Sequence, residues 1–345
     1  MTLEIRPVKT PASAGYEEVW LAEDASASYR GIIAVHNTRR GPALGGTRLM
    51  RYASDDAALT DVLRLARGMT FKCAAANLPL GGGKSVILAP LGDYDRPALL
   101  RAHGRAVDHL HGRYVTSVDI GTGPDDMVVV REATSHVTGL PNELGDPSPI
   151  TARGVVRAMQ AARQHNSGSA SLAGVRVAVQ GCGHVGRSLV EQLGTLGAKV
   201  IASDVDERRA DVARELCGAT ICDSDAIYGV QADIYAPCAT GATLNDSTIP
   251  RLTAHIVAGA ANNQLAEDRH DRALRDRGIL YVPDFIANAG GAIYLCRVLA
   301  GWSDAKVASA VEGIYDTALD VLQRAEQDGT GTLTAAEKIV ESRLH

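Results

Sequence analysis

Residues 175–206, VRVAVQGCGHVGRSLVEQLGTLGAKVIASDVD, predict the fold of the second half of this chain. The apolar run 175–179 is typical of a buried β-strand, and a glycine-rich turn follows it. Residues 187–196 then have the apolar spacing of a helix, and 200–202 predict the next strand. A strand, a glycine turn, a helix and a second strand in this order are the opening of a dinucleotide-binding Rossmann domain.

The glycine turn has the spacing Gly-x-Gly-x-x-Gly, with glycine at Gly181, Gly183 and Gly186. In that motif the first glycine allows the tight turn, the second lets a pyrophosphate approach backbone amides, and the third lets helix and strand pack closely. An ordinary glycine turn is the alternative, but the flanking elements favour nucleotide binding. The predicted cofactor-binding residues of the turn are Gly181, Cys182, Gly183, His184, Val185 and Gly186.

Asp204 ends the second predicted strand, 23 residues after Gly181. A carboxylate there accepts hydrogen bonds from the ribose hydroxyls of the adenosine half of NAD. The same charge would repel the 2′-phosphate of NADP, and no arginine follows before Arg208. The sequence therefore predicts NAD as the cofactor.

Length and composition predict an enzyme of two domains in the α/β class. The chain has 345 residues, 46% of them hydrophobic and 22% charged, which is ordinary for a soluble globular protein longer than one typical core. Its formal net charge of −5 argues against nucleic acid or an anionic membrane as the main partner. Residues 1–10 lack the apolar core of a signal peptide, and no apolar run is long enough to span a bilayer, so we expect a cytoplasmic protein.

The domain boundary is predicted within 139–149, a stretch dense in glycine, proline, asparagine and serine. We expect a first domain over 1–145 and a Rossmann domain over 146–319. A helical tail at about 320–345 is expected to pack back on the first domain.

Periodicity within the first domain predicts alternating strands and helices. Strands are expected over 29–36, 85–89 and 114–120, and helices over 54–72 and 96–110, with a further helix at 152–165 opening the second domain. The six cysteines form no CxxC pair, so we predict buried thiols and no metal site; Cys182 is expected to be a small filler in its turn.

Two lysines, Lys72 and Lys84, lie in residues 68–87, GMTFKCAAANLPLGGGKSVI. Three glycines precede Lys84, and backbone without side chains lets a small molecule come close to a lysine. The stretch is not a phosphate-binding P-loop, because that spacing requires glycine where Leu78 stands. We interpret Lys84 as an active-site lysine; a solvated charge in a loop is the alternative.

Eight segments, in order along nearly the whole chain, carry a resemblance to one family. Together they resemble the Glu/Leu/Phe/Val amino-acid dehydrogenases, and more closely the short branched-chain and phenylalanine enzymes than the longer glutamate enzymes. The segments are GPALGGTR (41–48), GMTFK (68–72), LPLGGGK (78–84), SVDIGT (117–122), the glycine turn, APCATGATLN (236–245), AGAANNQL (258–265) and PDFIANAGG (283–291).

The resemblance implies reversible oxidative deamination of an L-amino acid to a 2-oxo acid and ammonia, with hydride passing to NAD. It also implies an N-terminal domain that binds substrate and forms a homo-oligomer, a cleft between the two domains, and hinges near 139–149 and 289–291 that close it. Whether the oligomer is a dimer or an octamer is left open.

By the same resemblance, Lys72 binds the substrate carboxylate, Lys84 is the catalytic lysine and Asp119 completes proton transfer. The second ammonium nearby, that of Lys72, would lower the pKa of Lys84, so that its amine could act as a neutral base. For Asp119 the alternative is a turn-forming or capping carboxylate before Gly121.

Further substrate-binding residues are implied by matching family segments. Gly45 and Gly46 would lie beside the substrate carboxylate and amine, or form a simple turn; Met69 would line the pocket or fill core. His36 is expected to be structural. The other residues implied to contact substrate are Leu44, Ser117, Asn262, Ala292 and Leu295.

The cofactor side is implied by segments that follow successive strands of the Rossmann domain, where a nicotinamide lies. Asn262 and Asn288 offer both donors and acceptors. Thr151 matches a family threonine near the nicotinamide, with a helix N-cap as the alternative. The other residues implied here are Ala239, Thr240 and Ala260.

The preferred substrate is predicted to be L-phenylalanine. Ala292 stands where the branched-chain enzymes tend to have valine, and the smaller side chain leaves more room. Leucine or valine is the direct alternative, and tryptophan stays open, because pockets of this kind discriminate by shape. Met69 replaces the lysine of the glutamate branch, which disfavours glutamate. A module that binds NAD without catalysis is a remote alternative, disfavoured by the intact Lys72, Lys84 and Asp119.

Overall fold

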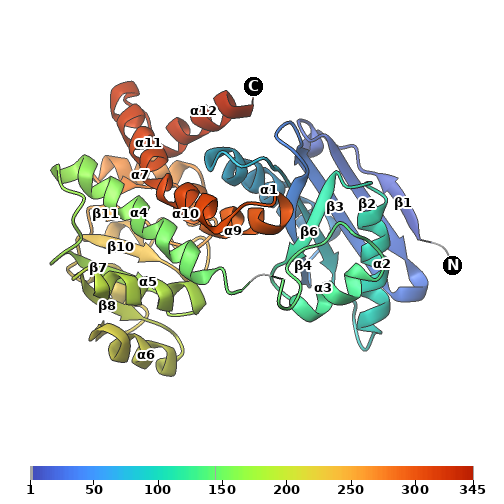
Figure 1. Ribbon diagram of the computed structural model, residues 1–345, viewed down its shortest axis with the longest axis horizontal. Helices are drawn as coiled ribbons and strands as arrows, with labels where there is room; N and C mark the ends of the chain where they lie inside the picture. Colours follow the sequence, from blue (N-terminus) through green and yellow to red (C-terminus); the bar gives the residue numbers. More distant parts are fainter. Residues whose placement is uncertain (1–2, 144, 345) are drawn as a thin grey trace. The chain divides into compact units, whose positions relative to one another are not determined.

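The computed structural model describes residues 3–143 and 145–344. By its contacts the chain divides into two compact units (Figure 1). Unit 1 holds residues up to Gly145 together with Leu295–Gly301 and Leu344, and unit 2 holds Asp146–Tyr294 and Trp302–Arg343. The two units are described separately.

Unit 1 is built on a mixed six-stranded sheet in the order β1-β2-β3-β5-β4-β6. The first three strands and β5 pair antiparallel, whereas β4 runs parallel to both β5 and β6. The strands are β1 (Glu4–Pro7), β2 (Glu18–Asp24), β3 (Tyr29–Asn37), β4 (Ala43–Met50), β5 (Gly81–Leu88) and β6 (Tyr114–Val118).

Three helices cover this sheet: α1 (Asp55–Ala75), α2 (Arg96–Asp108) and α3 (Pro124–Arg131). Because successive side chains of a strand point to opposite faces, each strand contributes to two cores. Ile32 and Val86 pack with the α1 residues, whereas Ile33 and Ile87 pack with residues of α2 and α3. The sheet therefore has one face toward α1 and one toward α2 and α3.

One predicted strand of this unit was wrong in its bounds: the strand expected over 85–89 begins at Gly81, so Lys84 lies inside β5 and not in a loop. The alternative of a turn at Gly45 and Gly46 is also wrong, because both residues lie in the middle of β4, a strand that the sequence pattern missed since glycine carries no β-strand signal. The other predicted strands and helices of the unit are confirmed, within a few residues at their ends.

Unit 2 contains a six-stranded sheet that is parallel throughout (Figure 1). Its order is β12-β11-β10-β7-β8-β9. If β7 is numbered 1 and the sheet is read from the β9 edge, the strands run 3-2-1-4-5-6. This is the Rossmann order, and the topology reverses between β7 and β10. The strands are β7 (Arg176–Gln180), β8 (Lys199–Ser203), β9 (Thr220–Ile221), β10 (Ile234–Pro237), β11 (Ile256–Val257) and β12 (Leu280–Tyr281). The predicted α/β class with a Rossmann domain is confirmed.

The helices after residue 146 begin with α4, which packs against α5 and α11. They are α4 (Ser148–Ser167), α5 (His184–Thr195), α6 (Glu207–Cys217), α7 (Arg269–Asp276), α8 (Asp284–Ala287), α9 (Gly290–Leu299), α10 (Asp304–Glu312), α11 (Ile314–Asp328) and α12 (Thr332–Leu344). Short 3-10 turns lie at Pro11–Ser13, Ala25–Ala27, Ala226–Gly229 and Ile249–Arg251.

The tail is held within unit 2 at the start of α12. Thr332 Oγ1 donates to Asp271 Oδ1 at 3.1 Å, and the Leu333 amide donates to the other carboxylate oxygen at 3.2 Å. Its packing on unit 1 stays a prediction.

Among the helices that the structure describes, none is long and apolar enough to cross a membrane. All six cysteines are free thiols.

Candidate active site

The α1 face of the sheet in unit 1 gathers the predicted catalytic residues. Lys84 has the same parity as Val86, which packs toward α1, and so its side chain lies on that face of β5. Gly46 of β4 is paired with Ser117 of β6, and Asp119 follows Ser117 with the same parity just beyond the end of β6. Three adjacent strands thus place their functional residues on one side of the sheet.

Glycine is required here because the backbones approach closely. A Cβ on Gly82 would lie 2.0 Å from the Thr70 amide nitrogen of α1, so only glycine lets this helix, which carries Met69 and Lys72, pack against β5. A Cβ on Gly46 would lie 2.4 Å from the Val118 carbonyl oxygen. The glycines therefore bring three elements together, a stronger reason than the loop flexibility expected from the sequence.

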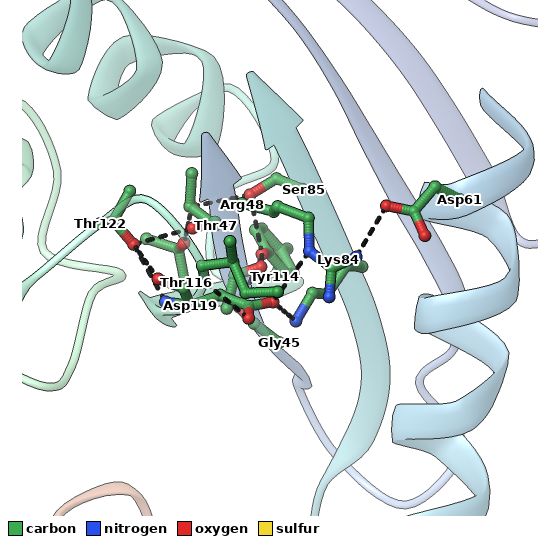
Figure 2. A network of polar contacts seen from close by, with 12 residues as sticks. Gly45, Thr47, Arg48, Asp61, Lys84, Ser85, Tyr114, Thr116, Asp119 and Thr122 are labelled. Atoms are coloured by element: carbon green, nitrogen blue, oxygen red, sulfur yellow. Dashed lines mark hydrogen bonds and ion pairs between the residues drawn. The ribbon is translucent and has the colours of Figure 1, made fainter. Parts of the chain in front are cut away.

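Lys84 and Asp119 form an ion pair between Nζ and Oδ2 (Figure 2). The two side chains are 9% and 18% exposed, so the pair is largely removed from water. The alternative that Lys84 is a solvated loop charge is wrong.

Burial is the main cause that lowers the pKa of Lys84 below its ordinary value, and the Arg48 guanidinium lowers it further; Asp119 acts in the opposite direction. The direction agrees with the prediction, and Arg48 is a contributing cation that the sequence pattern did not indicate. Burial would raise the pKa of Asp119, yet Lys84 and Arg48 together hold it below the usual range. Lys84 can therefore gain and lose a proton while the carboxylate of Asp119 stays ionised.

Hydrogen bonds fix the backbone of Asp119. Its amide donates to Thr122 Oγ1 at 2.9 Å, and that hydroxyl donates to the Thr47 carbonyl at 2.8 Å. Asp119 Oδ1 accepts the Ile120 amide at 2.7 Å. The turn-forming interpretation of Asp119 is thus correct for one oxygen, while the other faces Lys84.

A buried polar cluster lies on the opposite face of the same strands. Thr47 Oγ1 is 2.7 Å from Ser85 Oγ and 2.8 Å from His103 Nε2, and Tyr114 donates to the Gly45 carbonyl at 2.6 Å. Burial lowers the pKa of His103 to about 3, so this imidazole is neutral. The cluster fixes β4, β5 and β6 beneath the ion pair. Its only sequence signal was polar residues alternating with apolar ones.

The remaining predicted substrate residues of unit 1 lie on the elements that carry the pair. Leu44 in β4 and Ser117 in β6 are buried. Met69 and Lys72 lie in the last two turns of α1, both partly buried. His36 is 2.9 Å from Thr70 Oγ1, and burial lowers its pKa to about 4, as a structural histidine requires.

In unit 2 the glycine turn links β7 to α5. Gly181 has φ +96°, a conformation that favours glycine, and a Cβ on Gly186 would lie 1.9 Å from the Gly181 carbonyl oxygen. Gly183 is the N-cap of α5, and among the described residues no side chain caps that helix. His184 and Val185 form its first turn. The uncapped N-terminus of this helix fits a pyrophosphate.

Asp204 follows β8 and its Oδ2 accepts the Cys182 amide at 2.7 Å. The carboxylate therefore organises the turn and retains lone pairs for a ribose hydroxyl. The Cys182 side chain is buried, which raises the pKa of its thiol to about 11, in agreement with its interpretation as a filler.

The loops after β10 and β11 meet the end of α8. A Cβ on Gly181 would lie 2.8 Å from Ala239, where the sheet topology reverses. Asn288 Nδ2 donates to the Ala260 carbonyl at 3.1 Å and to Asn262 Oδ1 at 2.9 Å. Its Oδ1 is buried and accepts no hydrogen bond from the described residues, so an acceptor is left for the carboxamide of a nicotinamide.

Other predicted residues differ in surroundings. Thr240 is exposed beside Ala239, which the structure places after β10. Thr151 is not an N-cap, because α4 begins at Ser148 and Thr151 Oγ1 donates back to the Pro147 carbonyl at 3.0 Å. In α9, Ala292 is buried and Leu295 is partly buried.

Comparison with known proteins matches both parts of the chain. The family model of the Glu/Leu/Phe/Val dehydrogenase dimerisation domain matches residues 17–136. The Glutamate/Leucine/Phenylalanine/Valine dehydrogenase model matches 146–208 and 203–343.

Dehydrogenases named for different amino acids are similar to this chain to about the same degree. Leucine dehydrogenase of Bacillus cereus is 45% identical, covering 100% of this chain and 94% of the relative. Phenylalanine dehydrogenase of Caldalkalibacillus thermarum is 44% identical, covering 95% and 91%. The crystal structure of L-tryptophan dehydrogenase from Nostoc punctiforme has a TM-score of 0.85 at 42% identity, covering 96% of each chain.

These matches confirm the predicted family and its nicotinamide dinucleotide cofactor, but they do not single out phenylalanine as substrate. The chain belongs to the Glu/Leu/Phe/Val dehydrogenase family and is an amino-acid dehydrogenase.

Proposed function

We propose that this enzyme catalyses the reversible oxidative deamination of an apolar L-amino acid, with Lys84 as the proton-transferring base. The observation that carries the proposal is the buried pair of Lys84 and Asp119 on a glycine-lined face of the sheet. The amino acid, water and NAD⁺ are converted to the 2-oxo acid, ammonia, NADH and a proton.

Each proton step needs a group that is a base in one state and an acid in the next. The lowered pKa of Lys84 makes its neutral amine accessible below the ordinary range of lysine, so it can accept a proton from the attacking water. Asp119 holds the resulting ammonium by its Oδ2. The burial of both groups limits exchange of this proton with bulk water.

The bound nicotinamide supplies the hydride acceptor. Substrate orientation is assigned in unit 1 to Lys72, whose ammonium complements an α-carboxylate, together with Gly45 and Gly46; in unit 2 a substrate contact is assigned to Asn262. Cofactor orientation is assigned to the glycine turn, Asp204, Asn288 and the exposed loop at Ala239 and Thr240.

The cofactor is proposed to be NAD and not NADP. Asp204 presents a carboxylate where the 2′-phosphate of NADP would lie, and its Oδ2 is already fixed by the Cys182 amide. A fixed charge cannot turn away from a second anion without breaking the turn.

For the substrate we retain L-phenylalanine as the specific proposal, on the small side chain of Ala292. L-leucine is the second candidate, because leucine dehydrogenases are among the relatives at 45% identity. We also propose a homo-oligomer formed through unit 1, since residues 17–136 match a dimerisation domain.

The test is NADH formation by the purified protein with NAD and a panel of L-phenylalanine, L-leucine, L-valine, L-tryptophan and L-glutamate at alkaline pH. Turnover led by phenylalanine supports the full proposal, and turnover led by leucine, valine or tryptophan overturns the substrate but keeps the reaction. No turnover with any of them, while NAD still binds, would overturn the reaction.

A further inference from the structure

Arg48 lies next to the catalytic pair, in β4, on the same face as Lys84 (Figure 2). Its Nη1 is 2.9 Å from Asp61 Oδ2 of α1, and its Nε is 3.8 Å from Asp119 Oδ2. The Arg48 side chain is 15% exposed, so both contacts are shielded from water.

The four charges alternate along one line of contacts. Lys84 pairs with Asp119, Asp119 with Arg48, and Arg48 with Asp61, so two cations balance two anions. At the Asp61 end of this series, the Tyr52 hydroxyl donates a hydrogen bond to Asp61 Oδ2 at 2.8 Å. Charges this deeply buried are tolerated only when partners compensate them.

Loss of a proton from Lys84 changes this balance. Asp119 then keeps one cationic neighbour among these four groups, Arg48, and a buried carboxylate without a cation takes up a proton. Arg48 Nε is buried and donates no hydrogen bond to a described residue. Its N–H is therefore available to donate a hydrogen bond to the Asp119 carboxylate.

We propose that Arg48 is a positioning residue of this site: between Asp119 and Asp61, it keeps Asp119 ionised and directed at Lys84 when the lysine is neutral. The inference rests on the proposed role of Lys84 as a base.

The neighbours of Lys84 act on it with known signs. Arg48 of β4 lowers the pKa of Lys84, whereas Asp119 beyond β6 and Asp61 of α1 raise it. Neighbouring β3 carries His36, which is neutral because burial lowers its pKa to about 4, and α1 also carries Lys72 in its last turn. Removing Arg48 should therefore raise the pKa of Lys84, whereas removing the charge of Asp61 should lower it.

The experiment compares Arg48→Met, Arg48→Lys and Asp61→Asn with the unchanged enzyme, and Arg64→Met on the exposed side of α1 is the matched control. The first measurement is the pH profile of kcat/KM. Arg48→Met should move the acidic limb of this profile up by about one pH unit, which lowers kcat/KM about 10-fold at pH values below the limb. Asp61→Asn should move the limb down, and Arg48→Lys should restore its position.

A second measurement does not depend on activity. The chain has six lysines (Lys9, Lys72, Lys84, Lys199, Lys306 and Lys338), so trace acetylation by acetic anhydride followed by peptide mass spectrometry resolves each of them. Only the neutral amine reacts, and the pH midpoint for Lys84 should move up in Arg48→Met and down in Asp61→Asn.

The role of Arg48 would be overturned if the acetylation midpoint of Lys84 moved in the same direction in Arg48→Met and Asp61→Asn. It would also be overturned if both midpoints stayed at the value measured in Arg64→Met. Inactivity of the unchanged enzyme toward all amino acids would instead overturn the proposed function, and acetylation would still decide whether Arg48 controls Lys84. Thermal unfolding and NAD binding identify a variant that fails to fold, in which case Asp61→Asn and Arg48→Lys decide the matter.

Discussion

Gly46 and Asp119 lie so close that a Cβ on the glycine would be 2.9 Å from the Cβ of the aspartate. Real Cβ atoms do not approach a neighbour at this distance, so any side chain at Gly46 must displace Asp119. The position of the Asp119 carboxylate therefore depends on the absence of a side chain at Gly46 in the next strand.

Gly46→Ala is expected to lower kcat/KM at least about 100-fold, because a misplacement near 1 Å has an effect of that size. It should also cost about 1–3 kcal/mol of unfolding free energy through overpacking. Steady-state kinetics and thermal unfolding check both. Gly68→Ala in α1 is the control, because a Cβ there meets nothing within 4 Å and should leave activity unchanged. Equal effects of the two substitutions would contradict this account.

Lys84→Met is expected to lower kcat about 1,000-fold, since general acid–base catalysis contributes about 100- to 10,000-fold. In the unchanged enzyme the rate of deamination should fall as the pH drops through the pKa of Lys84, because the ammonium cannot accept a proton. That pKa lies below the ordinary 10.5, so the limb should lie below this value. Stopped-flow kinetics across pH, with Lys9→Met as control, measures both; a near-normal rate in Lys84→Met would exclude its role as base.

Asp204→Asn should relax the preference for NAD over NADP by about 10-fold or more, since asparagine keeps an oxygen for the Cys182 amide but removes the charge that repels the 2′-phosphate. The measurement is the ratio of kcat/KM for the two cofactors. Asp223→Asn, at an exposed position, is the control. An unchanged ratio would mean that Asp204 serves the turn alone.

Ala292→Val should shift the preference from phenylalanine toward leucine by about 10- to 200-fold, the range expected when a pocket loses a methylene or two of space. The ratio of kcat/KM for the two amino acids measures this. Val298→Ala, at an exposed position of the same helix, should leave the ratio unchanged. If this ratio is the same in Ala292→Val as in the unchanged enzyme, the basis for the substrate proposal is lost.

The Rossmann unit was predictable because its signals are local. The apolar strand, the glycine spacing and Asp204 all lie within residues 175–206, and the structure joins Asp204 to the turn through Cys182. In unit 1 the informative signals were weaker. Gly45 and Gly46 do not have the apolar alternation of a strand, yet they lie in β4 because neighbouring backbones fill the space of their side chains.

Arg48 and Asp61 could not be assigned from spacing. They belong to a strand and a helix whose relation depends on how α1 packs on the sheet, and only the fold brings Arg48 Nη1 within 2.9 Å of Asp61 Oδ2. Alternation along the strand gave no signal either. Arg48 lies between Thr47 and Leu49, which are both buried, and a charged residue between two buried neighbours is also typical of a strand with one face toward solvent.

Lys84 lies in β5 and Asp119 lies just beyond β6, with β4 between these two strands. The ion pair therefore forms only when three strands of the sheet are paired. These strands share their hydrogen bonds in one sheet, so the amides around Lys84 should exchange with deuterium only when unit 1 opens as a whole. Because β6 is an edge strand of this sheet and Asp119 lies just beyond its end, fraying there would separate Asp119 from Lys84 while the central strands stay paired, so activity in denaturant should be lost no later than global melting of this unit.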